Sequence, residues 1–326
     1  MTWRAPVGIG ASGLALSGCS EMQSALAPAG DEASRVALLS WILFAGAAAV
    51  LLIVCAALFL AIGGSERSRH ALRSENAVRL GGIIFPAVTL TVLLGYGVWL
   101  MRETIASDRP AALRIDITGE QWWWRVTYAG SDGQSFAEAN EVRLPVGREI
   151  DLVLRSTDVI HSFWVPSLGG KLDMIPGRAN TLRLKAERPG IYRGQCAEYC
   201  GGPHALMALE IVAMPDADFE AWLRSGAGAP AAGGSGSRGG ELFQAAGCGA
   251  CHAVRGTPAA GTIGPDLSRI GARRFLAAAT LPNTADNVAR FITSGQSIKP
   301  GNQMPEFRIF TEDELRALAT YLAGLK

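Results

Sequence analysis

The sequence predicts a multi-domain protein with two transmembrane α-helices, a β-sandwich or β-barrel, and a small all-α domain at the C-terminus. Two long apolar stretches, 36–62 and 80–101, predict the membrane helices. Between residues 111 and 212, short segments that alternate apolar and polar side chains are separated by turn signals, a pattern typical of half-buried strands. The last segment, 239–326, ends in an apolar stripe with helical spacing.

Each apolar stretch is long enough to cross a membrane. At about 1.5 Å per residue, a helix of this length covers the roughly 30 Å of a hydrocarbon core. Cys55, in the first stretch, is expected to be a small buried packing residue. By the positive-inside rule, the arginine-rich loop between the stretches lies in the cytoplasm, and both termini lie on the periplasmic side of a bacterial inner membrane. The loop arginines are Arg67, Arg69, Arg73 and Arg79.

The first residues resemble an export signal. Arg4 is followed by a short apolar stretch and then by Leu-Ser-Gly-Cys19, which resembles a bacterial lipoprotein box. The pattern predicts that residues 1–18 are removed as a signal peptide and that Cys19 carries a lipid anchor. The alternative is a weakly hydrophobic leader with an incidental cysteine.

A group of soft metal ligands lies near the end of the β-rich region. Cys196 and Cys200 are four residues apart, and His204 and Met207 follow them. His161 lies upstream in an apolar, strand-like stretch. Thiolate, imidazole and thioether ligands in this mixture select copper over harder cations. The pattern therefore predicts a copper site that transfers electrons.

Three alternatives stay open for these residues. A disulfide between the two cysteines is permitted outside the cytoplasm, but it leaves Glu198, His204 and Met207 without a role. A zinc site with two Cys and two His satisfies a tetrahedral ion without a methionine, but its ligand pairs usually have different spacing. Taken alone, Met207 is also compatible with a core methionine.

A second metal signature, Cys248-Gly-Ala-Cys251-His252, has the spacing for covalent attachment of a c-type haem. His252 is then the proximal ligand of the iron. Met304 is the expected second axial ligand, because the last domain contains no other methionine. Ligation by histidine and methionine raises the reduction potential of a haem. The alternative to Met304 is an open or differently ligated iron.

A linker rich in Gly, Ala and Ser separates the two redox regions, and it is predicted to be flexible because it has little apolar surface to bury. Such a tether would hold the C-terminal domain at high effective concentration near the copper site. The net charge of +1 indicates no nucleic-acid partner. The predicted division is a signal peptide (1–18), an N-terminal segment with the membrane hairpin (19–104), the copper domain (105–224), the linker (225–238) and the haem domain (239–326).

Several segments together resemble one protein family. They include both copper-ligand stretches and three parts of the last domain: 158–178, 194–204, 248–252, 264–267 and 299–305. On these motifs, the chain from residue 36 to residue 326 resembles subunit II of a haem-copper cytochrome c oxidase, in the variety with a fused class I cytochrome c domain.

The resemblance implies a cupredoxin-like Greek-key β-barrel that holds a dinuclear copper A centre. The sulfurs of Cys196 and Cys200 would bridge the two coppers. The Glu198 carboxylate would reach a magnesium or manganese ion shared with subunit I. The other implied copper ligands are His161, His204, Met207 and the backbone carbonyl of Glu198.

The resemblance also implies that Trp122, in a Gln-Trp-Trp-Trp segment, is the point at which electrons arrive from cytochrome c. The alternative is simple packing, which is expected of Trp123 or Trp124. The chain departs from the family pattern at Glu120 and Trp123, where the family usually has His and Tyr. A third departure is Arg79, at a position where the family often has a glutamate near a proton-uptake path. A fixed cation cannot relay protons, which argues against such a role for this subunit.

The implied function is to receive electrons within a larger oxidoreductase. Electrons would pass from cytochrome c or another reductase to the haem, then to the copper pair, then to the catalytic subunit I, where oxygen is reduced to water. Subunit III and membrane lipid are further expected partners. Two other classes stay open: the electron-receiving subunit of a haem-copper nitric oxide reductase, and a membrane-anchored copper carrier or electron shuttle.

Overall fold

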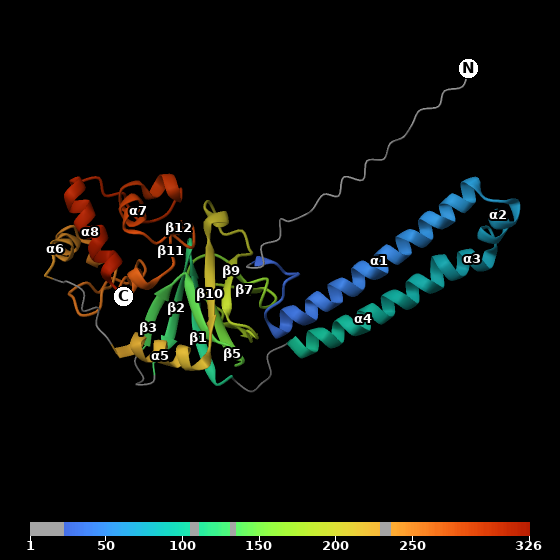
Figure 1. The fold of residues 1–326 in the computed structure, drawn as a ribbon, viewed down its shortest axis with the longest axis horizontal. Helices are drawn as coiled ribbons and strands as arrows, with labels where there is room; N and C mark the ends of the chain where they lie inside the picture. The colour runs from blue at the N-terminus through green and yellow to red at the C-terminus, as the bar shows by residue number, and fades with distance from the viewer. Residues whose placement is uncertain (1–22, 105–110, 131–134, 229–235) are drawn as a thin grey trace, which may run out of the picture.

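The computed structural model describes residues 23–104, 111–130, 135–228 and 236–326, so the predicted signal peptide and Cys19 lie outside the described residues. A helical hairpin projects from one side of a β-domain, and a small, mainly helical domain lies on the other side (Figure 1). This arrangement confirms the predicted fold class, with two candidate membrane helices, a cupredoxin-like β-domain and a helical C-terminal domain.

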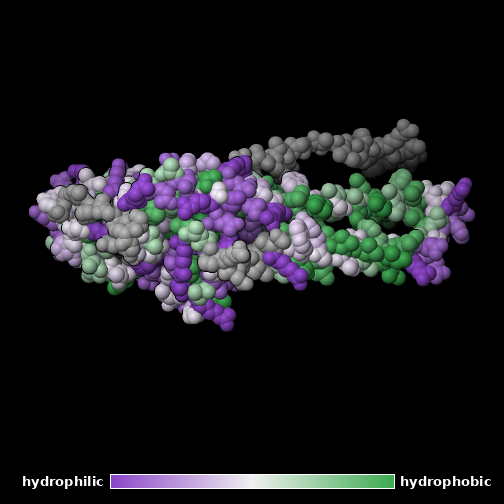
Figure 2. Space-filling model, turned by 90° about the horizontal axis from the view of Figure 1, so that it is seen from below, coloured by the Kyte–Doolittle hydropathy of each residue, from purple (hydrophilic) through white to green (hydrophobic). Residues whose placement is uncertain are grey.

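Two long antiparallel helices form the hairpin (Figure 1). Both are long and apolar enough to cross a membrane. Apolar side chains cover most of their surface, whereas polar residues gather at the turn that joins them (Figure 2). The helices are α1 (Asp31–Gly63), the short turns α2 (Glu66–Leu72) and α3 (Glu75–Arg79), the π-helix η2 (Leu80–Ile84), and α4 (Phe85–Thr104).

Cys55 is exposed on α1, so the prediction that it is a buried packing residue is wrong. The buried residues of this helix are Ala33 and Ala37, near its start. Beyond them, the apolar side chains face away from the rest of the chain. An outward apolar surface of this kind suits a helix that contacts lipid rather than a helix in a soluble core.

Ten strands form the β-domain as two five-stranded sheets, ordered β3-β2-β1-β5-β8 and β4-β10-β9-β6-β7. β1 pairs in parallel with β5, and β4 pairs in parallel with β10, while the other neighbours are antiparallel. The strands are β1 (Leu113–Glu120), β2 (Trp123–Ala129), β3 (Ser135–Ala139), β4 (Glu141–Pro145), β5 (Ile150–Ser156), β6 (His161–Trp164), β7 (Leu172–Met174), β8 (Asn180–Leu184), β9 (Gly190–Cys196) and β10 (Ala208–Met214).

The core of the β-domain is built from alternate residues of its strands. Ile115 and Ile117 of β1 are fully buried with Trp124 and Val126 of β2, because successive side chains of a strand point to opposite faces. The Trp124 ring packs edge-on against Phe163, with the ring centroids 5.8 Å apart. This confirms the packing role predicted for one of the three consecutive tryptophans.

Helix α5 (Asp216–Gly228) covers one end of the β-domain and extends beyond residue 225, so the predicted start of the linker is wrong. Gly226 packs directly on Phe136, because a Cβ at this glycine would lie 2.4 Å from the aromatic ring. The small residue therefore serves close packing rather than flexibility. Residues 229–235 lie outside the described residues, and the predicted flexibility of the linker stays a prediction.

The C-terminal domain packs its helices around Phe243, Leu318 and Leu322. A two-stranded ladder is an addition to the predicted all-α domain. The turn of this ladder contains three consecutive alanines, 277–279, with φ between 52° and 58°, a left-handed conformation that residues other than glycine rarely adopt. The elements are α6 (Arg238–Ala245), η4 (Cys248–Ala250), η5 (Ile270–Ala272), β11 (Phe275–Leu276), β12 (Leu281–Pro282), α7 (Ala285–Ile298) and α8 (Glu312–Gly324).

Candidate metal centre and haem pocket

The predicted copper ligands gather at one end of the β-domain. His161 begins β6, Cys196 ends β9, and Cys200 follows in the next loop. One donor atom from each of these three residues lies within 4.8 Å of the other two, and all three residues are buried. Because β6 pairs with β9, with Phe163 opposite Cys196, the sheet itself brings the distant histidine to the cysteine loop.

The remaining predicted donors complete the cluster. His204 Nδ1 lies 3.4 Å and Met207 Sδ lies 3.7 Å from Cys200 Sγ. The backbone carbonyl oxygen of Glu198 lies 3.2 Å from Cys196 Sγ, and the two cysteine sulfurs are 3.7 Å apart as free thiols. This set exceeds the four ligands of a structural zinc ion, and its soft sulfur and imidazole donors fit copper.

The two thiols differ in how readily they ionise. The hydrogen bond with Cys200 lowers the pKa of Cys196 to about 4, although burial opposes the thiolate. The same hydrogen bond, together with burial, raises the pKa of Cys200. The pair therefore releases one proton readily and holds the second, which a bound metal ion must displace.

Asp158 connects the copper cluster to the tryptophan segment. One of its carboxylate oxygens lies 2.8 Å from His161 Nε2, and the other accepts the backbone N–H of Gln121 at 2.6 Å. The carboxylate thus holds the imidazole so that Nδ1 faces the cluster. Burial disfavours the imidazolium, but hydrogen bonds with Cys196 and Asp158 outweigh it and raise the pKa of His161.

Replacing Asp158 by asparagine is expected to lower the unfolding free energy of the metal-free chain by about 1–3 kcal/mol near neutral pH. Burial raises the pKa of this carboxyl, but hydrogen bonds from His161, Gln121 and Val159 lower it overall in the folded state. A lowered folded-state pKa means that the stabilisation is present above the carboxyl's unfolded pKa and is lost as the pH falls through the folded-state pKa.

Thermal unfolding of the metal-free chain, measured in buffers of decreasing pH, checks this expectation. The difference in Tm between the unaltered chain and Asp158→Asn should shrink on acidification. Asp218→Asn, at an exposed position on α5, is the matched control and should show little difference. A difference that stays constant at all pH values would contradict the expected role of Asp158.

The c-type haem motif lines an apolar cavity in the C-terminal domain. Cys248, Cys251, His252 and Met304 all contribute to its wall. His252 Nδ1 donates to the carbonyl of Pro265 at 2.8 Å, which leaves Nε2 free to bind iron. Burial lowers the pKa of His252 and so favours the neutral imidazole that ligation needs. These residues fit a covalently attached haem.

Trp122 lines the same cavity, although it belongs to the β-domain. Its indole Nε1 donates to the backbone carbonyl of Cys200 at 2.9 Å. Gly201 permits this contact, because its φ is +114° and a Cβ there would lie 3.1 Å from the indole ring. The tryptophan therefore contacts the copper loop and the haem cavity at once.

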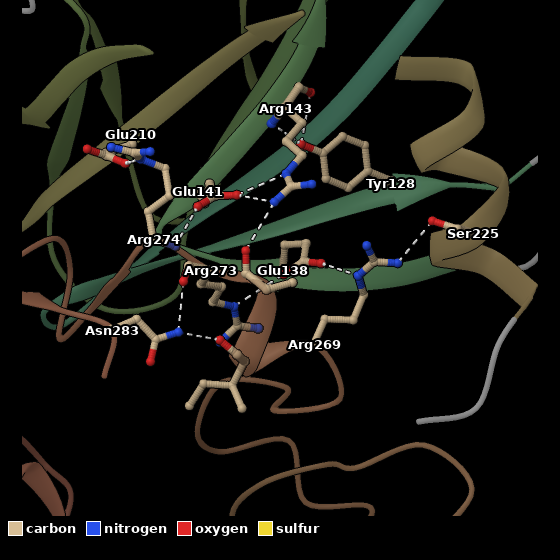
Figure 3. Close-up of polar contacts among 12 residues, drawn as sticks. Tyr128, Glu138, Glu141, Arg143, Glu210, Ser225, Arg269, Arg273, Arg274 and Asn283 are labelled. Atoms are coloured by element: carbon tan, nitrogen blue, oxygen red, sulfur yellow. Dashed lines mark hydrogen bonds and ion pairs between the residues drawn. The ribbon is translucent and has the colours of Figure 1, made fainter. Parts of the chain in front are cut away.

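Ion pairs with buried carboxylates join the C-terminal domain to the β-domain (Figure 3). The carboxylate of Glu138 faces Arg269 at 3.3 Å and Arg273 at 3.2 Å. Glu210 pairs with Arg274 at 2.9 Å. Pairs of this kind offset the cost of burying their charges only while both partners stay in place. The C-terminal domain is thus docked by contacts of its own, in addition to its covalent connection.

Glu120 and Trp123 act together at this interface. Glu120 binds Arg125 at 2.6 Å, and the Arg125 guanidinium lies 4.6 Å from the ring centroid of Trp123. Arg125 in turn donates to the carbonyl of Thr262 in the C-terminal domain at 2.8 Å. Glu120 and Trp123 therefore position an arginine that contacts the second domain.

Comparisons with known proteins match both the β-domain and the C-terminal domain. The family "Cytochrome C oxidase subunit II, periplasmic domain" matches residues 131–214, and the family "Cytochrome c" matches residues 236–326. Cytochrome c oxidase subunit 2 of Alkalihalophilus pseudofirmus is 32% identical over 332 residues, which cover 96% of this chain and 94% of that relative. The chain belongs to the cytochrome c oxidase subunit 2 family.

Other members of the subunit 2 family match over shorter lengths. The Bacillus subtilis protein is 31% identical over 227 residues, which cover 66% of this chain and 63% of that relative. The solved periplasmic domain of subunit II from Bradyrhizobium japonicum is 34% identical and covers 37% of this chain and 96% of that domain, with a TM-score of 0.34.

As a subunit 2 family member, the chain is one subunit of an oxidoreductase. The two matched families imply copper A and haem. The structure also assigns contacts to residues that the sequence pattern did not single out, notably Asp158, Glu138 and Lys299. Asp158 offered a signal, because a carboxylate three residues before His161 is a common partner for a metal-binding imidazole. Glu138 and Lys299 offered none, because their partners belong to another domain.

Proposed function

We propose that this chain receives electrons at a covalently bound haem c and passes them through Trp122 to a dinuclear copper A centre. From there the electrons reach a catalytic subunit I, which reduces oxygen to water. One observation carries the proposal: Trp122 lines the haem cavity while its indole N–H donates to the carbonyl of Cys200. When bound, the haem and the copper pair each take up and release single electrons.

In this proposal, every donor side chain has one role. Cys196 and Cys200 would supply thiolate ligands to the copper pair, and Cys248 and Cys251 would attach the haem. The paired strands β6 and β9 hold His161 and Cys196 in place, and burial of the cluster limits access of water, which keeps ligand movement small during electron transfer. The remaining ligands are His161, His204, Met207 and the Glu198 carbonyl for copper, and His252 and Met304 for the haem iron.

The shared name of the relatives, cytochrome c oxidase subunit 2, favours an oxidase over the nitric oxide reductase that the ligand pattern alone leaves open. The buried donor cluster supports an electron-transfer site over an exchangeable copper carrier. We place the arginine-rich turn in the cytoplasm and both redox domains outside. A lipid anchor at Cys19, a magnesium or manganese ion at Glu198, subunit III and cytochrome c as donor stay predictions.

Replacing Trp122 by leucine tests the electron path. Transfer from haem to copper should slow by about 10-fold to 100-fold, the range typical of residues that contact a metal ligand. The measurement is the rate of copper reduction after rapid reduction of the haem in the assembled oxidase. Trp41→Leu, at an exposed position on α1, is the control. An unchanged rate, with both metal centres retained in the variant, would remove Trp122 from the path.

A further inference from the structure

Lys299 is a buried lysine at the boundary between the two redox domains. It follows the last residue of α7 and is only 3% exposed. Its Nζ donates to the carbonyl of Trp122 at 2.5 Å and to the carbonyl of Leu206 at 2.9 Å, both in the β-domain. A third acceptor, the carbonyl of Ala277, lies at 3.5 Å in its own domain.

Burying the Lys299 amino group costs free energy unless its N–H donors are hydrogen-bonded. An ammonium group has three donors, and the three carbonyls match that number. Burial lowers the pKa of Lys299 to about 7, an effect that the nearby Cys200 sulfur partly opposes. A buried amino group without these acceptors would have a large desolvation cost. Lys299 therefore stabilises the arrangement in which these carbonyls converge on its amino group.

Each acceptor belongs to a segment that carries a redox ligand or contacts one. Trp122 lines the haem cavity and donates to Cys200, and Leu206 immediately precedes Met207. Ala277 begins the left-handed alanine turn, which also lines the haem cavity. Holding these carbonyls on one ammonium group thus fixes the copper loop and the haem cavity relative to each other.

The loop after Lys299 continues this contact toward the haem. A Cβ at Gly301 would lie 3.8 Å from the Trp122 ring and 3.7 Å from Pro203 of the copper loop. Three residues later the chain reaches Met304 in the cavity wall. A single short loop therefore lies beside the tryptophan and the copper loop and carries the proposed iron ligand.

We propose that Lys299 is a positioning residue for electron transfer between the two domains, because it holds Trp122 and the copper loop against the haem cavity. The proposal rests on the electron path proposed above. The arginine and glutamate pairs also join the two domains, through Glu138 and Glu210 (Figure 3). Lys299 sets the relative position of the domains at the redox sites themselves.

The test compares Lys299→Met in the assembled, metal-loaded oxidase with the matched control Lys326→Met, an exposed lysine of the same domain. Methionine keeps most of the side-chain volume and removes the donors. Hydrogen exchange of backbone amides in 119–125 and 203–209 should become at least about tenfold faster in Lys299→Met, the change expected when hydrogen bonds to a charged group are lost. Haem-to-copper transfer should slow by at least about tenfold, with the absorption spectra of both centres unchanged.

A conservative replacement separates positioning from general damage. Lys299→Arg keeps a cationic side chain with several N–H donors at the same position. Slow exchange and fast transfer should be retained at least in part in Lys299→Arg, whereas Lys299→Met should retain neither.

Normal exchange and normal transfer in Lys299→Met would overturn the role of Lys299 and leave the electron path intact. Slower transfer with unchanged exchange would also overturn it, because the effect would not then arise from positioning. Absence of haem-to-copper transfer in the unaltered chain would instead refute the proposed function, and the positioning role with it.

Discussion

Replacing Cys196 by serine is expected to remove copper from the protein while leaving the haem in place. The Cys196 sulfur is central to the cluster, since it contacts His161, Cys200 and the carbonyl of Glu198. A serine hydroxyl is a hard donor that stays protonated at neutral pH and does not replace a thiolate. Copper affinity should fall more than about 100-fold, because replacing residues outside the ligand shell already costs about 10–100-fold.

Metal analysis of the purified oxidase checks this result, together with the rate of electron transfer beyond the haem. The haem should still be reduced, but the electron should pass no further. Cys55→Ser is the matched control, because it makes the same chemical change at an exposed position on α1. Full copper content in Cys196→Ser, with its normal absorption, would contradict the ligand assignment.

Reversing the charge of Glu138 is expected to release the C-terminal domain from the β-domain. In Glu138→Lys, an ammonium group would face Arg269 and Arg273 at a buried position. Losing one partner of a buried charge pair costs about 2–5 kcal/mol, which lowers the ratio of docked to undocked molecules roughly 30-fold or more. Haem-to-copper transfer should slow in proportion, because the covalent connection alone no longer fixes the geometry.

Distances between spin labels on the two domains would measure docking directly. They should be short and uniform in the unaltered chain and broadly distributed in Glu138→Lys. Glu187→Lys makes the same charge change at an exposed site of the β-domain and should leave both distances and rates unchanged. The double variant Glu138→Lys with Arg273→Glu should recover part of the docking, since it restores opposite charges. Unchanged distances in Glu138→Lys would show that the ion pairs do not hold the domains.

Much of the fold could be read from local patterns. The two membrane helices follow from long apolar stretches, and the strands follow from alternation such as Ile150, Leu152 and Leu154. Local patterns failed where a small residue had a packing partner far away in the chain. Gly226 resembles a linker residue, and its role becomes visible only when Phe136 is placed beside it. The prediction that Cys55 is buried was wrong for a related reason, since burial depends on what the helix packs against.

The sequence by itself determined which residues are candidate ligands. Cys196, Cys200, His204 and Met207 share one loop, so their spacing already limits them to one site, and the Cys248 to His252 motif carries its chemistry in five adjacent residues. These signals are local, because the donor atoms come from neighbouring residues.

Only the tertiary structure decided how the two redox regions meet. Strand pairing between β6 and β9 brings His161 to the cysteine loop. Docking of the second domain brings Trp122 to the haem cavity, Glu138 to Arg273, and Lys299 to two carbonyls of the β-domain. These contacts join residues far apart in the sequence, and ion pairs and hydrogen bonds to backbone carbonyls leave no repeating pattern along the chain. They depend on charge and surface matching between folded domains, which exists only once both domains have formed.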